Sequence, residues 1–282
     1  MEAETRLVGS SEISCTPGNV VLVGCGNMGA ALLGGWLAQG MDRNRLHVID
    51  SAPEGRERAR SMQVRTSAAP TKGLGTVEVL VLAVKPQQLD DMLGDYTGFV
   101  EAGAAILSIA AGKPIAYYER RLGRERPIVR AMPNTPAAIG QGITALVANA
   151  AVDERQRAMA ETLMRAVGDV VWLADESLMD AVTAVSGSGP AYVFLLIEAL
   201  TVAGQAAGLD TELAGRLAMA TVAGAGAYAS RSELAPAALR RQVTSPGGTT
   251  QAALEVLMRE PGLEQLVKDA VRAAAKRSRD LA

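Results

Sequence analysis

The sequence predicts an α/β Rossmann-type domain built on a parallel sheet, followed by an all-α domain. From Asn19, short β-branched runs alternate with Ala- and Leu-rich stretches, and a glycine-rich turn follows the first run. Near-continuous apolar strands alternating with helices are typical of a parallel sheet covered on both faces. After about residue 175 the strand-like runs stop. We therefore expect a flexible arm over 1–18, a sheet domain over 19–175 and a helical domain over 176–282.

Six runs are predicted as strands: 19–24, 45–50, 77–84, 104–110, 126–130 and 142–149. Helical stretches between them fit right-handed βαβ crossovers. Five later segments are predicted as helices: 190–207, 211–229, 235–242, 249–259 and 262–280. Glycines inside these helices cost about 1 kcal/mol each relative to Ala. We expect them to allow close helix–helix approach in an intertwined dimer, the alternative being a glycine-tolerant composition (Gly204, Gly208, Gly215, Gly224 and Gly226).

Composition excludes several classes of protein. The chain is 49% hydrophobic and 21% charged with a net charge of -2, which argues against a disordered chain or a nucleic-acid partner. Its two cysteines form neither a disulfide framework nor a metal pattern, which favours the reducing cytoplasm. The N-terminus lacks the apolar core of a signal peptide, and no uninterrupted apolar run approaches the roughly 20 residues of a membrane span. We expect a soluble cytoplasmic protein.

Residues 21–40, VLVGCGNMGAALLGGWLAQG, place Gly24, Gly26 and Gly29 between a predicted strand and a predicted helix. These glycines permit a tight turn, close approach of the backbone to a pyrophosphate and tight packing of helix on strand. The N–H groups at the helix start, over Asn27 and Met28, then face the phosphates. The pattern predicts a nicotinamide or flavin dinucleotide site; a glycine turn without a ligand is the alternative.

Asp50, followed by Ser51, ends the second predicted strand. An acid at this point usually binds the ribose 2′-hydroxyl of NADH and repels the 2′-phosphate of NADPH. Arg56 and Arg58 are near enough in sequence to pair with such a phosphate instead. Asp50 is also placed to cap the helix that follows Pro53. The choice between NADH and NADPH stays open.

The single histidine, His47, lies within the second predicted strand, away from the carboxyl ends where ligands bind in such sheets. Dehydrogenases of the lactate or malate kind need a histidine acid/base at the reacting carbonyl. Histidine therefore does not supply the proton in whatever reaction this chain catalyses.

Three loops are further candidates. AVKP (83–86) ends a strand, so the backbone of Ala83, Val84 and Lys85 should point toward a cofactor, although Lys85 alone also fits a surface lysine. RAMPNTPAAIG (130–140) places Asn134 beside the same sheet edge, with a structural turn as the alternative. QVTSPGGTT (242–250) interrupts a helical region with residues that disfavour helix, which indicates a loop that holds a ligand.

SGSGPAYVF (186–194) is expected to open the first long helix with hydroxyls and glycines, and Pro190 suits its first turn. Helix capping alone also explains these residues.

In order along the chain, GCGNMG, AVKP, SIAAG (108–112), RAMPNTP, SGSGPAYVF (186–194) and SPGGTT resemble the pyrroline-5-carboxylate reductase family over about residues 19–280. The resemblance implies a Rossmann domain and a helical domain that dimerises and binds substrate. It also implies hydride transfer from NADPH or NADH to the C=N bond of 1-pyrroline-5-carboxylate, giving L-proline in the last step of proline biosynthesis. Such an imine, once protonated, is already electrophilic, which fits the absence of a histidine at the predicted ligand-binding edge.

The resemblance further implies site residues. In the helical domain, Ser245 and the N–H groups where the 249–259 helix begins would hold the substrate carboxylate, and Thr250 would hydrogen-bond the ring nitrogen. The implied substrate set is Glu233, Val243, Ser245, Gly248, Thr249 and Thr250, with Thr250 as the catalytic residue. Ala111, in SIAAG, joins the cofactor set. Glu233 also fits a solvated surface glutamate.

The sequence departs from the family on the adenosine side. Relatives often carry Ser or an Asn-Arg pair after the second strand, where this chain has Asp50-Ser51-Ala52-Pro53. Two other functions remain open: another imine or β-hydroxyacid reductase of the same two-domain plan, and a dinucleotide sensor without activity.

Overall fold

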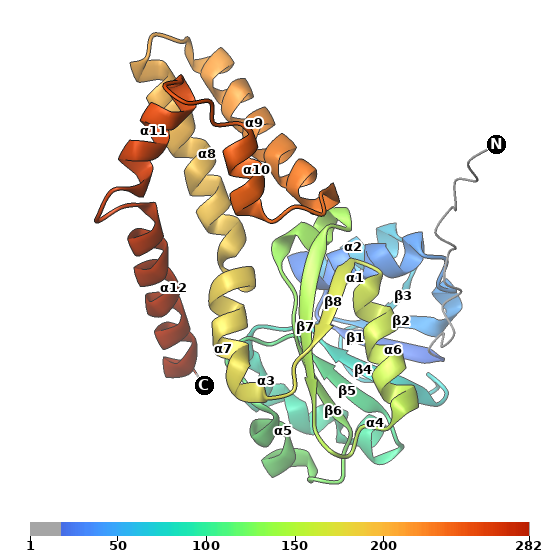
Figure 1. The fold of residues 1–282 in the computed structure, drawn as a ribbon. Coiled ribbons are helices and arrows are strands. Elements are labelled where there is room, and N and C mark those ends of the chain that lie inside the picture. The colour runs from blue at the N-terminus through green and yellow to red at the C-terminus, as the bar shows by residue number, and fades with distance from the viewer. Residues whose placement is uncertain (1–17, 282) are drawn as a thin grey trace, which may run out of the picture. The chain divides into compact units, whose positions relative to one another are not determined.

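The computed structural model describes residues 18–281, which form two compact units. We call residues 18–182 together with 278–281 the sheet unit, and residues 183–277 the helical unit (Figure 1). The predicted arm lies outside the described residues apart from Gly18.

The sheet unit holds an eight-stranded sheet in the order β3-β2-β1-β4-β5-β6-β7-β8. All neighbouring strands pair in parallel except β6 and β7, which are antiparallel. The prediction of a mostly parallel Rossmann-type sheet is confirmed. The strands are β1 (Asn19–Val23), β2 (Leu46–Ile49), β3 (Arg65–Ser67), β4 (Val77–Leu82), β5 (Ala105–Ser108), β6 (Ile128–Met132), β7 (Gly142–Ala148) and β8 (Gly168–Trp172).

Two strands, β3 and β8, are absent from the prediction. Both lie at the edges of the sheet, where one side is exposed and a continuous apolar run is not required. β3 reads Arg-Thr-Ser, and β8 begins Gly-Asp with Val171 40% exposed. β3 is polar throughout, and β8 begins with two residues that are depleted in strands, which explains why the apolar pattern did not reveal them.

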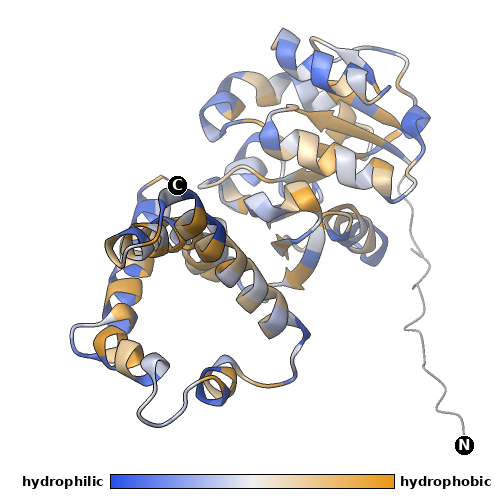
Figure 2. Ribbon diagram, turned by 90° about the horizontal axis from the view of Figure 1, so that it is seen from above, coloured by the Kyte–Doolittle hydropathy of each residue, from blue (hydrophilic) through white to orange (hydrophobic). Residues whose placement is uncertain are grey.

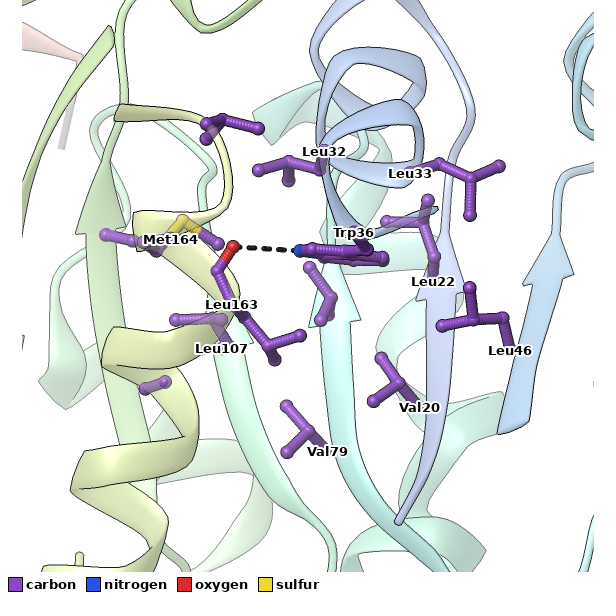
Figure 3. Close-up of a cluster of buried hydrophobic side chains, with 14 of the residues drawn as sticks. Val20, Leu22, Leu32, Leu33, Trp36, Leu46, Val79, Leu107, Leu163 and Met164 are labelled. Atoms are coloured by element: carbon purple, nitrogen blue, oxygen red, sulfur yellow. Dashed lines mark hydrogen bonds between the residues drawn. The ribbon is translucent and has the colours of Figure 1, made fainter. Parts of the chain in front are cut away.

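Helices cover both faces of the sheet, and side chains alternate along each strand. Val20 and Leu22 of β1 belong to one buried cluster, whereas Val21 and Val23 belong to the other. In the first cluster the Trp36 indole Nε1 donates a hydrogen bond of 2.8 Å to the Leu163 carbonyl (Figure 3). The helices are α1 (Asn27–Ala38), α2 (Pro53–Ser61), α3 (Leu89–Met92), α4 (Thr97–Glu101), α5 (Ile115–Leu122), α6 (Glu154–Arg165) and α7 (Met179–Val182).

The sheet unit extends past residue 175, the predicted domain limit, because residues 176–182 are held by its core. Met179 is 1% exposed in the second cluster. Glu176 pairs with Arg130 of β6 at 2.8 Å, and Ser278 donates a hydrogen bond of 2.6 Å to the Asp180 carboxylate. The end of the chain therefore returns to the sheet unit.

The helical unit contains α8 (Gly189–Ala206), α9 (Thr211–Arg231), α10 (Pro236–Gln242), α11 (Thr249–Met258) and most of α12 (Leu263–Asp280). All five begin and end within two residues of the predicted helices. SGSGPAYVF was expected to open the first long helix. Instead a π-helical turn, Thr183–Gly187, precedes α8, so this motif lies inside a longer helical run. Pro190 occupies the first turn of α8, as expected.

Within the described residues 183–277, the helical unit buries only three alanines: Ala184, Ala214 and Ala218. Large apolar side chains lie exposed instead, among them Leu195 at 63% and Leu266 at 66%. Apolar stretches recur along the helices of this unit in Figure 2. Burial of apolar surface dominates the stability of a fold, and contacts within one chain bury little of the apolar surface of this unit. Exposed apolar surface of this extent is typical of an interaction surface.

The helical run 176–206 is long and apolar enough to cross a membrane by length and composition alone, with 0% of its most apolar window buried. The prediction that no segment spans a membrane was based on the absence of a long uninterrupted run of apolar residues. The mean hydropathy of the run is high because its charged residues, such as Glu198, are few and aliphatic side chains lie between them.

Candidate functional site

The turn after β1 uses its three glycines for three different purposes. Gly24 has φ +90°, and a Cβ there would lie 2.7 Å from the Ala83 carbonyl oxygen after β4. A Cβ on Gly29 would overlap the Gly24 carbonyl oxygen, so this glycine packs α1 against the turn. A Cβ on Gly26 would meet nothing within 4 Å. Gly26 therefore leaves open space where a ligand can approach the backbone.

The N-terminus of α1 faces this open space with no acidic residue in its own first turn. Gly26 is the N-cap, no side chain caps the helix, and its first turn contains no acid. The first N–H groups of a helix have no partner within the helix and form its positive end. Asn27 is exposed and Met28 is half-buried at this point. The open space and the uncapped N–H groups fit the pyrophosphate of a dinucleotide.

Asp50 connects the end of β2 to the glycine turn. Its Oδ2 accepts a hydrogen bond of 2.7 Å from the Cys25 N–H, and its Oδ1 accepts one of 2.9 Å from the Ala52 N–H. Ala52 is the N-cap of α2 and makes no side-chain cap. The alternative that Asp50 is the capping residue of this helix is therefore wrong. Ser51, beside it, is exposed.

Two arginines of α2 donate hydrogen bonds to backbone carbonyls at or near Asp50 and the glycine turn. Arg56 Nη1 donates to the Asp50 and Ser51 carbonyls at 2.7 and 2.8 Å, and Arg58 Nη1 donates to the Cys25 carbonyl at 3.1 Å. Burial raises the pKa of the Cys25 thiol, an effect that the Arg58 charge opposes and the Asp50 charge reinforces. Cys25 is 0% exposed, so it is a buried, protonated thiol of low reactivity.

The loops after β4, β5 and β6 begin at the same edge of the sheet, because parallel strands end at one edge. Ala83 and Val84 are half-buried after β4, whereas Lys85 is exposed. Ala111 is exposed after β5. The structure thus brings the cofactor-side residues predicted from the sequence to one edge, with the glycine turn after β1 and Asp50 after β2.

Asn134 secures the loop after β6. Its side-chain Oδ1 accepts a hydrogen bond of 2.9 Å from the Ile143 N–H at the start of β7. The loop thus contains the structural turn given as the alternative: Asn134 is the N-cap residue of a short 3-10 helix, Thr135–Ile139.

A polar cluster beneath these loops escaped the sequence prediction. The Ser108 hydroxyl at the end of β5 hydrogen-bonds the Tyr118 hydroxyl, and both residues are 0% exposed. Burial raises the pKa of Tyr118 to about 12, so its hydroxyl stays protonated. Nearby, Arg130 is 6% exposed and its partner Glu176 also accepts the Ile115 N–H at 2.9 Å. A charged residue inside an apolar strand was the available signal for Arg130.

His47 is remote from the carboxyl edge, as expected. It is 8% exposed within β2, and its Nε2 lies 2.9 Å from the Ser67 hydroxyl of β3. Burial lowers its pKa, and the neighbouring Arg65 charge lowers it further. A neutral imidazole held by a serine in the sheet is a structural residue. Among the described residues, no group of three His, Cys, Asp or Glu side chains could hold a metal ion.

The loop between α10 and α11 carries the residues predicted to bind substrate. Gly247 has φ +70°, and its N–H donates to the Gln251 side chain at 2.7 Å. The Gly248 N–H donates to the Ser245 carbonyl at 3.0 Å, which closes a tight turn before the helix. Gly248 is then the N-cap of α11, which has no side-chain cap and no acid in its first turn.

The start of α11 therefore shares two features with the start of α1: a glycine at the N-cap, and no side-chain cap or acid in the first turn. Thr249 and Thr250 are the first two helical residues, Thr249 exposed and Thr250 half-buried. Ser245 and Val243 lie exposed in the preceding turn. Glu233 lies exposed in the connection between α9 and α10, in the same unit.

Comparison with known proteins agrees with both units. The family model described as "Pyrroline-5-carboxylate reductase dimerisation" matches residues 176–281, which includes the apolar helical run. The model described as "NADP oxidoreductase coenzyme F420-dependent" matches residues 19–112.

Curated relatives match over nearly the whole chain. A pyrroline-5-carboxylate reductase of Pseudomonas aeruginosa is 44% identical, covering 93% of this chain and 96% of the relative. One of Synechocystis is 41% identical, covering 92% and 97%.

Solved structures give the same result. A pyrroline-5-carboxylate reductase from Coxiella burnetii superposes with a TM-score of 0.89 at 38% identity, covering 95% of this chain and 99% of that one. The Plasmodium falciparum enzyme, solved with NADP bound, has a TM-score of 0.81 at 28% identity, covering 93% and 97%. The glycine turn after β1, the uncapped start of α11 and these relatives agree, and the chain belongs to the pyrroline-5-carboxylate reductase family.

Proposed function

We propose a division of labour for this NAD(P)H-dependent oxidoreductase: the carboxyl edge of the sheet binds the cofactor, and the loop before α11 binds the cyclic imine. The observation that carries this proposal is the pair of uncapped helix N-termini, each preceded by a glycine turn. One suits a pyrophosphate and the other suits a small carboxylate. Both partners of the reaction, NAD(P)H and 1-pyrroline-5-carboxylate, carry such an anion.

On the cofactor side, backbone groups do most of the work. The turn at Gly26 and the N–H groups at the start of α1 would hold the pyrophosphate, with the loops after β4, β5 and β6 along the nicotinamide end. A bound nicotinamide supplies the hydride. The proposed cofactor set is Gly24, Gly26, Asn27, Met28, Gly29, Asp50, Ser51, Ala83, Val84, Lys85, Ala111 and Asn134.

On the substrate side, Ser245 and the first N–H groups of α11 would hold the carboxylate, and the Thr250 hydroxyl would hydrogen-bond the ring nitrogen. The remaining proposed contacts are Glu233, Val243, Gly248 and Thr249. No histidine acts, because the single one is structural. The site then works by orienting an already electrophilic imine and excluding water.

We also propose that the active form is at least a homodimer formed through the helical unit. The exposed apolar faces of α8 to α12 support this, since a second copy would cover them and supply the missing core. A partner copy explains the apolar run 176–206 without a membrane. A cytoplasmic location fits the cysteine content, with Cys25 a free thiol.

The direct test is the decay of nicotinamide absorbance with purified protein and 1-pyrroline-5-carboxylate, run in parallel with NADH and NADPH. Other cyclic imines and β-hydroxyacids form the comparison panel. Preferential turnover of 1-pyrroline-5-carboxylate supports the assignment. Absence of turnover on it by folded, oligomeric protein would contradict it.

Thr250 is tested separately. Thr250→Ala should lower kcat about tenfold or more, because the hydroxyl that orients the ring nitrogen is lost. The free energy of unfolding should change by at most about 1 kcal/mol, the usual value of a hydroxyl at a helix start. Thr250→Ser keeps the hydroxyl and should keep most of the activity. Equal kinetics for Thr250→Ala and wild type would remove Thr250 from the site.

A further inference from the structure

Asp50 offers a fixed carboxylate where the adenosine ribose of a dinucleotide lies. Its two oxygens are held by N–H groups from two different segments, Cys25 in the glycine turn and Ala52 before α2. Behind it, a Cβ on Gly55 would overlap the Asp50 carboxylate, so the side chain is wedged against α2. The acid is therefore fixed in position.

The carboxylate cannot turn aside at low cost. Cys25 is 0% exposed, and moving Asp50 away would leave its buried N–H without a hydrogen-bond partner. A carboxylate offers about four acceptor positions, and two are used here. Asp50 can therefore accept a hydrogen bond from a ribose 2′-hydroxyl while keeping both backbone contacts.

A 2′-phosphate meets the opposite situation. A phosphate monoester carries between about 1.5 and 2 negative charges near neutral pH, and like charges set side by side weaken binding strongly. At the carboxyl end of the second strand, the acid and the 2′ substituent are neighbours. NADPH would therefore place its phosphate against a carboxylate that cannot retreat.

Arg56 and Arg58 are the groups that could offset this repulsion. Arg58 is exposed and Arg56 is half-exposed, and both are held by carbonyl oxygens. Solvent screens the charge of the exposed Arg58 guanidinium. The Arg56 guanidinium is held to the Asp50 and Ser51 carbonyls by two hydrogen bonds, so we expect the charge of the Asp50 carboxylate to dominate at the 2′ position.

We infer that Asp50 is the residue that makes this enzyme select NADH over NADPH. The inference rests on the proposed cofactor site. It marks a departure from the Plasmodium falciparum relative, which was solved with NADP bound.

The test measures binding and needs no turnover. Calorimetry on the full chain compares ADP-ribose with 2′-phospho-ADP-ribose, and nicotinamide fluorescence compares NADH with NADPH. Wild type should bind the forms without the 2′-phosphate at least about tenfold more tightly. The ratio should shrink as salt is raised, because the discrimination is electrostatic.

Two variants test whether the charge of Asp50 sets the binding ratio. Asp50→Asn removes the charge and should shift the ratio about tenfold toward NADPH. Glu101→Gln removes an equal charge from an exposed position at the end of α4, which precedes β5, and should leave the ratio unchanged. Circular dichroism establishes that each variant is folded. If Asp50→Asn fails to fold, the wild-type ratio and its salt dependence decide the matter.

Equal or tighter wild-type binding of the phosphorylated forms would overturn the inference and leave the cofactor site intact. An unchanged ratio in folded Asp50→Asn would overturn it as well. If folded wild-type protein binds none of the four nucleotides, the proposed cofactor site fails and the inference fails with it.

Discussion

The sheet unit and the helical unit bury their apolar residues in opposite ways. The sheet unit packs two clusters around its strands, with Trp36, Tyr118 and Leu32 at most 1% exposed. Within residues 183–277, by contrast, the helical unit buries no side chain larger than alanine and leaves Leu195 63% exposed. The first unit can be stabilised by its own contacts. The second buries little apolar surface within one chain, and we propose that a second copy covers the rest. The stability of the helical unit should therefore depend on protein concentration, whereas that of the sheet unit should not.

The largest effect is expected from a charge introduced on the exposed face of α8, where we propose that a second copy binds. Leu195→Glu should dissociate the oligomer, because an unpaired charge cannot be buried between subunits. Turnover should fall by at least about a hundredfold, since small displacements of a site already cost that much. Nucleotide binding by the sheet unit should remain. Light scattering after size-exclusion chromatography, the turnover assay and nucleotide binding measure the three effects.

The matched control is Val171→Glu on edge strand β8, where the side chain is 40% exposed in the unit with its own core. It should leave the oligomer and turnover as in wild type. Dissociation by Val171→Glu, or an intact oligomer with Leu195→Glu, would contradict the contrast between the units.

A second comparison uses cavities. Leu32→Ala in the sheet unit should lower the free energy of unfolding by about 2–5 kcal/mol, as expected for a fully buried leucine. This loss should not depend on protein concentration. The effect of Leu196→Ala, at a 46% exposed position of α8, should depend on it, because the lost contacts belong to the partner. Urea unfolding at two protein concentrations distinguishes the cases, and concentration independence of both variants would count against the proposal.

A smaller contrast lies within the glycine turn. Gly26→Ala should leave the fold unchanged and weaken nucleotide binding about tenfold or more. The added Cβ would enter the open space where we propose that the pyrophosphate binds. Gly29→Ala should destabilise the sheet unit, since its Cβ overlaps the Gly24 carbonyl oxygen. Thermal unfolding and nucleotide titration of both variants give the answer. Equal effects of the two substitutions would show that Gly26 does not face a ligand.

The smallest expected effect is a pH dependence of the sheet unit. Burial lowers the pKa of His47 below its ordinary value of 6.5, so above that value the imidazole is neutral in both states. As pH falls through 6.5 the unfolded chain takes up a proton first, and stability declines until the folded pKa is passed. His47→Gln should flatten this decline in urea unfolding between about pH 7.5 and 5. Identical slopes would show that His47 is not its source.

Much of the fold was predictable because its signals are local. The glycines of the turn after β1 and the apolar central strands follow directly from backbone geometry and burial. The five helices of the helical unit were predictable for the same reason, since Pro246, Gly247 and Gly248 interrupt an otherwise helical composition. In the candidate site, the glycines after β1 and the Pro-Gly-Gly run before α11 predicted the positions of the two glycine turns.

What escaped prediction depends on contacts between distant segments. The edge strand at Arg65–Ser67 exists because it pairs with β2, and its own residues favour no strand. Asp50 reaches Cys25 across 25 residues, and Arg130 meets Glu176 across 46. Only the fold brings such partners together, so sequence spacing could not distinguish a cap from an anchor at Asp50.

The contact between Asp180 and Ser278 defines where the chain leaves the sheet unit and where it returns. The helical unit is therefore an insertion into the sheet unit, and the residues that flank its two ends, Asp180 and Ser278, are joined by a hydrogen bond. Insertions with adjacent ends can be lengthened, shortened or exchanged without rerouting the host chain. The proposed substrate loop and the exposed apolar faces both lie in residues 183–277, so changes to either would leave the path of the eight-stranded sheet as it is.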